Sequence, residues 1–437
     1  MRTWNGVVLL VLGWGVACNG TSTGNPMDGA GAAGKGQLGE GMELFMSTVP
    51  YESEPDVSGE DAAALAEGNR AFAFDLYRRL AKPDENLFFS PFSISTALAM
   101  TYAGARGETK TEMQNTLHFA LPEPALHAAF NGASLALKTR ADDVAQDGSG
   151  TGFDLRVVNQ AFGQRGYPFL DEYLGVLAQN YGSGMISVDF GDSEATRVSI
   201  NGWVEDQTEE RVKDLLPPGA LTVDTRLVLT NAIYFKASWA SQFKLEDTVD
   251  AAFHAPAGER TVPMMNQQVV ADYAEGDGYQ AVELPYVSAA VRMLFILPSE
   301  GQFEAFSSSL DDAVLSQIRS GLMESEVTLG LPRFSFESEN PLKAPLQALG
   351  MSLPFNDADF TGIAGGIEPL FIDEVYHKAF VGVDEEGTEA AAATAVVVNT
   401  ESAKPSVQVT FDRPFVICLY DQPTGQILFL GQLSDPG

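Results

Sequence analysis

Residues 384–405 read DEEGTEAAAATAVVVNTESAKP, and this stretch is anomalous because it suits two different structures. Its alanines and the acids before them favour a helix, since alanine is the best helix former and acids stabilise a helix N-terminus. Its alternation favours a strand with one face of small or β-branched, uncharged side chains. That face comprises Thr388, Ala390, Ala392, Thr394, Val396 and Val398. The stretch can therefore be exposed as a loop and also fit the middle of a sheet.

The remainder of the chain predicts helices first and strands later. Apolar residues at helical spacing predict helices over 65–80, 109–117 and 198–216. Alternating or β-branched runs predict strands over 226–235, 291–297, 326–331, 407–411, 415–420 and 427–433. This order indicates an α+β fold. No Pro/Gly/Ser-rich break or internal repeat divides the chain after residue 61, so one folded domain is expected.

The charge balance excludes some classes of partner. The chain has 26 Lys+Arg against 59 Asp+Glu, which gives a formal net charge of −33. A nucleic-acid binder needs clustered cations for phosphate contacts, so none is expected here. Anionic lipid head groups would also repel such a surface.

Catalytic and metal-binding patterns are missing from the sequence. It holds no GxSxG, HExxH, CxxC or P-loop motif, and its four histidines, His118, His127, His254 and His377, do not stand at metal-ligand spacing. Two GxGxxG matches lie in a Gly/Ala-rich tract without a strand before or a helix after them, so they do not indicate a dinucleotide site. Cys418 lies in an apolar strand pattern and is expected to be a buried packing residue. No enzyme activity, metal or cofactor is predicted.

The N-terminus predicts export and a membrane anchor. Residues 1–17 combine a lone cation with an apolar stretch too short to span a bilayer, which is typical of a signal peptide. The end, Gly15-Val16-Ala17-Cys18, resembles a bacterial lipoprotein signal with Cys18 as the lipidated residue, although Gly15 departs from that pattern. An ordinary signal peptide cleaved near Ala17 is the alternative. Residues 18–60 predict a flexible, acidic linker, and residues 61–437 the folded domain. The expected location is the cell-envelope surface or the extracellular or periplasmic space.

Several motifs in a fixed order resemble the serpin family. They include Asn86-Leu-Phe-Phe-Ser-Pro-Phe-Ser-Ile-Ser95, Asn231-Ala-Ile-Tyr-Phe-Lys236 with Trp239 after it, Leu331-Pro-Arg-Phe334, His377-Lys378-Ala379 and Arg413-Pro414-Phe415. The resemblance implies one α+β domain with three β-sheets, a helical layer and an exposed reactive-centre loop. It also implies a monomeric suicide inhibitor of serine, or cysteine, endopeptidases that forms a covalent acyl complex with its target.

The resemblance also assigns roles to particular residues. The hinge of the loop comprises Glu385, Gly387, Thr388, Ala390, Ala392 and Thr394. The polar cluster called the shutter comprises Ser90, Ser93, Asn231 and His377, for which ordinary helix capping is the alternative. The breach, where the loop first enters the sheet, comprises Trp239 and a pair formed by Arg333 and Glu385. The inward hinge face carries no charge, which favours an inhibitor because burying an unpaired charge is costly.

The family's nearly constant hinge length places the scissile bond between Glu401 and Ser402. A target with a preference for acidic residues would follow. Lys404 precedes Pro405, which blocks tryptic cleavage, and Thr400 or Ala403 remain alternatives. Two other functions stay open: a non-inhibitory serpin acting as a carrier or surface protein, and a lipid-anchored hydrolase, against which the missing nucleophile motif counts.

Overall fold

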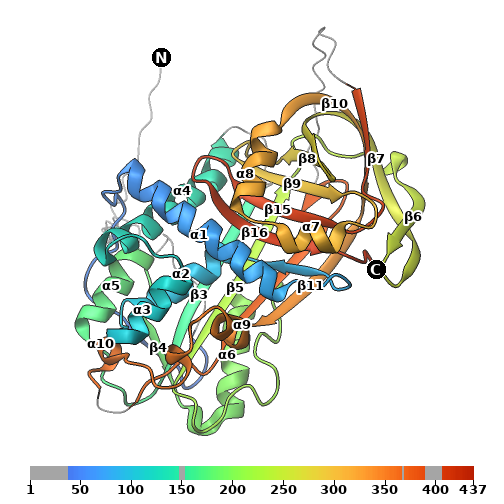
Figure 1. Ribbon diagram of the computed structural model, residues 1–437. Coiled ribbons are helices and arrows are strands. Elements are labelled where there is room, and N and C mark those ends of the chain that lie inside the picture. The colour runs from blue at the N-terminus through green and yellow to red at the C-terminus, as the bar shows by residue number, and fades with distance from the viewer. Residues whose placement is uncertain (1–37, 147–152, 367–368, 389–405) are drawn as a thin grey trace, which may run out of the picture.

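The computed structural model describes residues 38–146, 153–366, 369–388 and 406–437 (Figure 1). Its helices are α1 (Gly59–Leu80), α2 (Pro91–Tyr102), α3 (Gly107–Thr116), α4 (Glu123–Gln146), α5 (Asp171–Tyr181), α6 (Ser193–Gln207), α7 (Phe303–Ser309), α8 (Asp312–Gly321), α9 (Lys343–Ala348) and α10 (Thr361–Ala364). Short 3₁₀ turns are η1 (Phe190–Asp192), η2 (Leu245–Asp247) and η3 (Leu353–Phe355).

The strands are β1 (Glu43–Phe45), β2 (Leu87–Phe89), β3 (Phe153–Gln164), β4 (Met185–Val188), β5 (Leu227–Ser238), β6 (Val249–Ala255), β7 (Gly258–Gly276) and β8 (Tyr279–Pro285). The later ones are β9 (Val291–Pro298), β10 (Met323–Pro332), β11 (Phe334–Pro341), β12 (Val375–Val383), β13 (Gly387–Thr388), β14 (Ser406–Thr410), β15 (Phe415–Asp421) and β16 (Gln426–Leu433). The α+β class is confirmed, as is each of the six predicted strands.

Hydrogen bonds join these strands into two sheets instead of the three expected. One has seven strands in the order β1-β4-β3-β5-β13-β12-β11, and the other has nine strands, with β14-β10-β7-β8-β9-β15-β16-β2 in order and β6 beside β7. The 19-residue β7 pairs in turn with β6, β10 and β8, so it connects strands that would otherwise form separate sheets.

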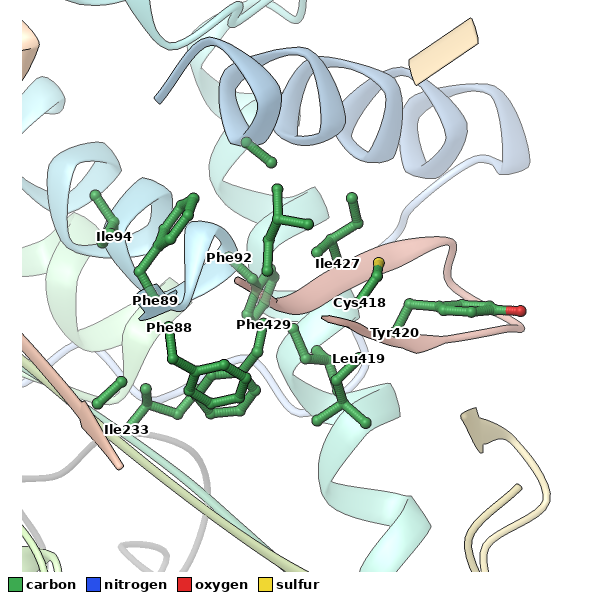
Figure 2. Packing of buried hydrophobic residues seen from close by; sticks show 14 of the residues in the cluster. Phe88, Phe89, Phe92, Ile94, Ile233, Cys418, Leu419, Tyr420, Ile427 and Phe429 are labelled. Atoms are coloured by element: carbon green, nitrogen blue, oxygen red, sulfur yellow. The ribbon is translucent and has the colours of Figure 1, made fainter. Parts of the chain in front are cut away.

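The main hydrophobic core lies between the two sheets and the helices α1 and α2. Figure 2 shows Phe88 against Phe429, whose rings are stacked 4.6 Å apart, with Ile233 of the other sheet beside them. Cys418 points into this core from β15 and is 1% exposed. The predicted packing role of Cys418 is confirmed, and burial raises the pKa of its thiol to about 12.

One predicted helix is too long. The pattern over 198–216 predicted a continuous helix, but α6 ends at Gln207. Glu209, Glu210 and Asp214 adopt positive φ angles of 50°, 60° and 49°, which a right-handed helix excludes. The apolar residues after the break still lie in the core, so the pattern reported burial correctly and helix length incorrectly.

The predicted flexible linker is wrong for residues 43–58. Strand β1 pairs antiparallel with β4, Glu52 N donates to Gln179 O (2.9 Å), and Tyr51 Oη donates to Asn131 Oδ1 (2.5 Å). Leu44 and Val57 of this segment pack against the domain although most of its acids are exposed, and composition alone does not reveal these contacts. Helix α1 begins at Gly59, so the domain starts well before residue 61.

No helix in the described part of the chain is long and apolar enough to cross a membrane. The predicted signal peptide and Cys18 lie outside the described residues, and so does the linker before residue 38.

Candidate functional site: the opening of the seven-stranded sheet

Strands β5 and β12 are joined along only half of their length. They pair directly and in parallel from Val375–Ala379 to Leu229–Ile233. Beyond that point the two-residue strand β13 lies between them, with Thr388 opposite Ala237 on one side and Val383 on the other. The start of the predicted hinge therefore already occupies a strand position in the centre of the sheet.

The two residues of β13 fit this position for different reasons. A Cβ atom on Gly387 would lie 2.1 Å from the carbonyl oxygen of Ala237, so only glycine allows the strands to approach this closely. Thr388 is 2% exposed, and its hydroxyl lies 2.7 Å from the hydroxyl of Tyr286. The buried polar atom of Thr388 is thereby satisfied, which permits a polar residue on the inner face of the sheet.

The predicted breach residues meet where the chain enters the sheet. Trp239 is buried, stacks on Tyr286 with ring centres 4.4 Å apart, and donates from Nε1 to the carbonyl of Asp384 (3.1 Å). The predicted pair between Arg333 and Glu385 forms. These contacts fix the backbone immediately before β13.

Glu385 is held by more partners than sequence reasoning predicted. Its carboxylate accepts a hydrogen bond from Thr248 Oγ1 (2.6 Å), and its carbonyl accepts one from Phe243 N (2.9 Å). Burial alone would raise the pKa of Glu385, but the hydrogen bonds from Arg333 and Thr248 and the positive charge of Arg333 lower it overall. Glu385 is therefore an ionised anchor for the hinge.

The predicted shutter residues form a buried polar row where β5 and β12 pair directly. Asn231 of β5 lies opposite both His377 of β12 and Asn159 of β3, and it bonds to both. Below the row, Asn231 Nδ2 donates to Ser93 Oγ (2.5 Å), while Ser90 N donates to His377 Nε2 (3.0 Å). Ser90 is also the N-cap of α2, so this residue both caps the helix and contacts the polar row.

His377 is neutral in this row. Its Nε2 accepts from a backbone N–H, so the ring proton lies on Nδ1 and is donated to Asn231 Oδ1. Burial lowers the pKa of His377 to about 3, against a smaller opposing effect of its hydrogen bond with Asn231. The row therefore adds hydrogen bonds across the sheet without a buried charge.

A second segment covers the half of the sheet in which β5 and β12 pair directly, on the face opposite the main core. The segment after α6 buries Val212, Leu215 and Leu216 there, and Lys378 of β12 donates to the carbonyl of Lys213 (2.9 Å). Lys378 also pairs with Glu337 and Glu339 of β11. A strand that entered between β5 and β12 would have to pass beneath this segment.

Not all predicted site residues can be placed. Ala390, Ala392, Thr394 and the bond between Glu401 and Ser402 lie outside the described residues. Sequence reasoning missed Asn159, Tyr286 and Thr248, which carry no local signal because each acts through a partner far away along the chain. Within the described ranges, no group of three or more His, Cys, Asp or Glu residues could hold a metal ion.

Comparison with known proteins agrees with this architecture. Residues 67–436 match the family model described as serpin (serine protease inhibitor). The chain is 43% identical to an uncharacterized serpin-like protein of Thermococcus kodakarensis, over 89% of this chain and 90% of the relative. It is 38% identical to the leukocyte elastase inhibitor of Sus scrofa, over 85% of this chain and 99% of the relative.

Solved structures show the same fold. Human thyroxine-binding globulin, solved in complex with thyroxine, superposes with a TM-score of 0.76 at 30% identity, covering 86% of this chain and 99% of that protein. The family match and the curated relatives each extend over most of the chain, and the open sheet with its hinge lies within the matched region. This protein belongs to the serpin family.

Proposed function

We propose that this protein inhibits serine endopeptidases as a suicide substrate. A target protease cleaves the loop between Thr388 and Ser406 and remains attached as an acyl-enzyme. The released loop then enters the seven-stranded sheet between β5 and β12 and carries the protease with it. Insertion of a serpin loop is an example of strand addition to a sheet.

The register of β13 carries this proposal. Gly387 and Thr388 lie opposite Ser238 and Ala237, so continuation of the same antiparallel register places Ala390 opposite Phe235 and Ala392 opposite Ile233. Phe235 and Ile233 are 2% and 0% exposed and belong to the main core. Only small, uncharged side chains can enter such a packed face, and the alternation of the loop supplies them.

Thr394 supports the same register from both sides. Continuation along β5 places it opposite Asn231, and continuation along β12 places it opposite His377. These two residues now bond to each other, and an inserted strand would separate them. The hydroxyl of Thr394 can then donate to one and accept from the other, so the polar row stays satisfied.

The energy favours insertion once the loop is cut. About ten further residues would each add a ladder hydrogen bond worth about 1 kcal/mol net, so on the order of 10 kcal/mol is released before apolar burial is counted. The intact loop is attached at both ends and cannot reach this arrangement freely. The native state is therefore kinetically trapped, and the outcome depends on whether insertion is faster than deacylation.

The scissile bond is proposed to join Glu401 and Ser402, which directs the inhibitor toward glutamyl-specific endopeptidases. Thr400 and Ala403 remain alternatives that suit elastase-like or subtilisin-like targets. A carrier function is the second candidate, because thyroxine-binding globulin in complex with thyroxine shares this fold. The uncharged, small inner face of the loop favours inhibition over that candidate.

The test is a panel of glutamyl-specific, elastase-like and subtilisin-like serine endopeptidases mixed with the full-length protein. An SDS-resistant covalent complex is expected, and mass spectrometry of the released peptide identifies the bond. Complete loop cleavage without any complex would contradict inhibition and favour the carrier function. Release of a peptide that begins at Glu401 or Lys404 would move the bond to the position after Thr400 or Ala403 but preserve the mechanism.

The location is a second part of the proposal. An export signal over residues 1–17 and a lipid on Cys18 would tether a monomeric inhibitor to the cell-envelope surface, with the lipid as its only membrane contact. The composition of the stretch after Cys18 and the acidic surface support a display of the domain away from anionic head groups.

A further inference from the structure

The described chain ends at Thr388 and resumes at Ser406, and one exposed surface lies between these two points. At the first point, Thr248 holds Glu385 just before the loop, and η2 immediately precedes Thr248. At the second point, the chain returns at Ser406 into β14, which runs parallel to β10. Strands β7 and β10 lie between η2 and β14. We define the outward side of this area as the loop-flanking face.

The loop-flanking face exposes apolar side chains that the fold does not require outside. Leu245 of η2 is 70% exposed and Val270 of β7 is 47% exposed. Val270 lies directly opposite Glu326 of β10, and Glu326 lies opposite Ser406 of β14, so apolar and acidic residues share one row across three strands. Hydrogen bonding from Asn266 Nδ2 to Asp247 O (3.1 Å) joins η2 to β7.

The charge of the face has one dominant sign. Residues 264–273, 323–332 and 406–410, which form its strands, contain no Lys, Arg or His. The acids on or beside it are Asp272, Glu324 and Glu326 from the strands and Glu246 and Asp247 from η2. The cations near these acids are Lys244, which is exposed, Arg333, which pairs with Glu385 beside Thr248, and Arg292, which bonds to Asp272 (2.9 Å) and Glu283 (2.7 Å).

From this arrangement we infer that the loop-flanking face docks the body of the target protease, and that this protease carries a basic rim with an apolar spot beside its active site. The inference rests on the proposed function, since it requires a protease at the loop. Ser406 lies four residue steps after Ser402, and an extended chain spans at most about 3.5 Å per step, or about 14 Å. A protease domain of ~250 residues has a radius of gyration of about 18 Å, so its body cannot avoid the face.

Other occupants fit the face less well. A second copy of the chain would bring one acidic surface against another, and an anionic membrane would be repelled for the same reason. A basic protease gains steering from the acids and an apolar contact at Leu245 and Val270. Rim charges of this kind act on the association rate more than on the chemistry that follows.

The experiment compares variants of the full-length protein as substrates of two glutamyl-specific endopeptidases, one with a basic and one with an acidic surface. The variants are Glu326→Lys and Val270→Thr. Matched controls are Glu172→Lys on α5 and Val198→Thr on α6, where Val198 is 56% exposed. The measured quantity is the second-order rate constant of loop cleavage, whether or not a covalent complex follows. A synthetic peptide of residues 384–405, which lacks the face, is cleaved in parallel.

Glu326→Lys should slow cleavage by the basic protease by roughly threefold to tenfold at low ionic strength, and about 0.5 M salt should remove most of that effect. Both control variants should show no such loss with the basic protease, and Glu326→Lys should show none with the acidic protease. The peptide, which lacks position 326, gives the cleavage rate without the face. Equal rates for Glu326→Lys and Glu172→Lys would overturn the docking face. The yield of covalent complex is recorded separately, so failure of inhibition and failure of docking give different results.

Discussion

Two arginine variants, one on each face of the inserting loop, test the strand register that underlies the proposed mechanism. Ala390→Arg directs the side chain toward Phe235 in the main core when the loop inserts. Glu389→Arg places the same side chain one residue away on the opposite face, beside Lys236, which is only partly buried. The two variants have the same added group and differ mainly in the face that must accept it.

The cost differs strongly between the two faces. Burying an unpaired guanidinium costs several kcal/mol, and even about 3 kcal/mol slows insertion by roughly 150-fold. On the outer face, the guanidinium meets one like charge in water, which costs less than about 1 kcal/mol. Ala390→Arg should therefore let deacylation overtake insertion and turn the inhibitor into a substrate, whereas Glu389→Arg should still inhibit.

Position 390 is a cleaner test than position 388. Thr388 is already buried against Tyr286 in the intact protein, so Thr388→Arg would also disturb the starting state. The assay is the stoichiometry of inhibition, read from the ratio of covalent complex to cleaved protein on SDS gels. Unchanged melting of both intact variants is the folding control. Equal stoichiometry for Ala390→Arg and Glu389→Arg would refute the proposed register.

Four further outcomes are expected. Cleavage of the loop by a protease that does not remain bound should raise the melting temperature greatly, because the trapped sheet gains a strand; equal melting of cut and intact protein would mean that no insertion occurs. A chain that begins at Asp61 should melt several degrees lower than one that begins at Leu38, because it lacks β1 and the contacts of residues 51–52; identical melting would show that this segment adds no stability. The pKa of His377 falls from 6.5 to about 3 on folding, so the unfolded chain binds the additional proton and the free energy of unfolding should decrease as the pH falls from about 6.5 toward 3. His377→Gln should flatten this part of the pH profile of the free energy of unfolding, measured with urea. An unaltered profile would contradict a buried neutral imidazole. Cys18→Ser should release the protein from the membrane fraction of an expressing bacterium without changing its inhibition rate, and retention of the variant would exclude the lipid anchor.

Local pattern was sufficient for the elements with the clearest periodicity. Helix α1 and strands β5, β9, β10, β15 and β16 follow from their own periodicity, because each buries one face or both against the same core. The pattern failed where backbone conformation, not burial, ends an element. Val212 and Leu215 continue the apolar stripe of α6, although positive φ at Glu209 and Glu210 has already ended the helix.

The candidate site also contains some residues that sequence motifs predicted and others that only the structure reveals. Four shutter residues and the pair of Arg333 with Glu385 came from motifs that resemble a known family, and the structure brings these residues together. Asn159 completes the polar row but lies in an ordinary strand pattern, so only its pairing with Asn231 reveals it. The ordered segment over 43–58 was missed because its composition is that of a spacer, and its order depends on the edge of β4.

Helix α1, the six predicted strands and the small, uncharged face of the loop could be predicted from the sequence, since these properties depend on neighbours within a few positions. Only the tertiary structure decided that Thr388 is already in the sheet, because its partner Tyr286 is 102 positions away along the chain. It also decided which loop residues would face the core, since that requires the register of β13 against β5 and β12. Strand registers and buried hydrogen bonds join distant segments, and no local pattern specifies which segment will be opposite.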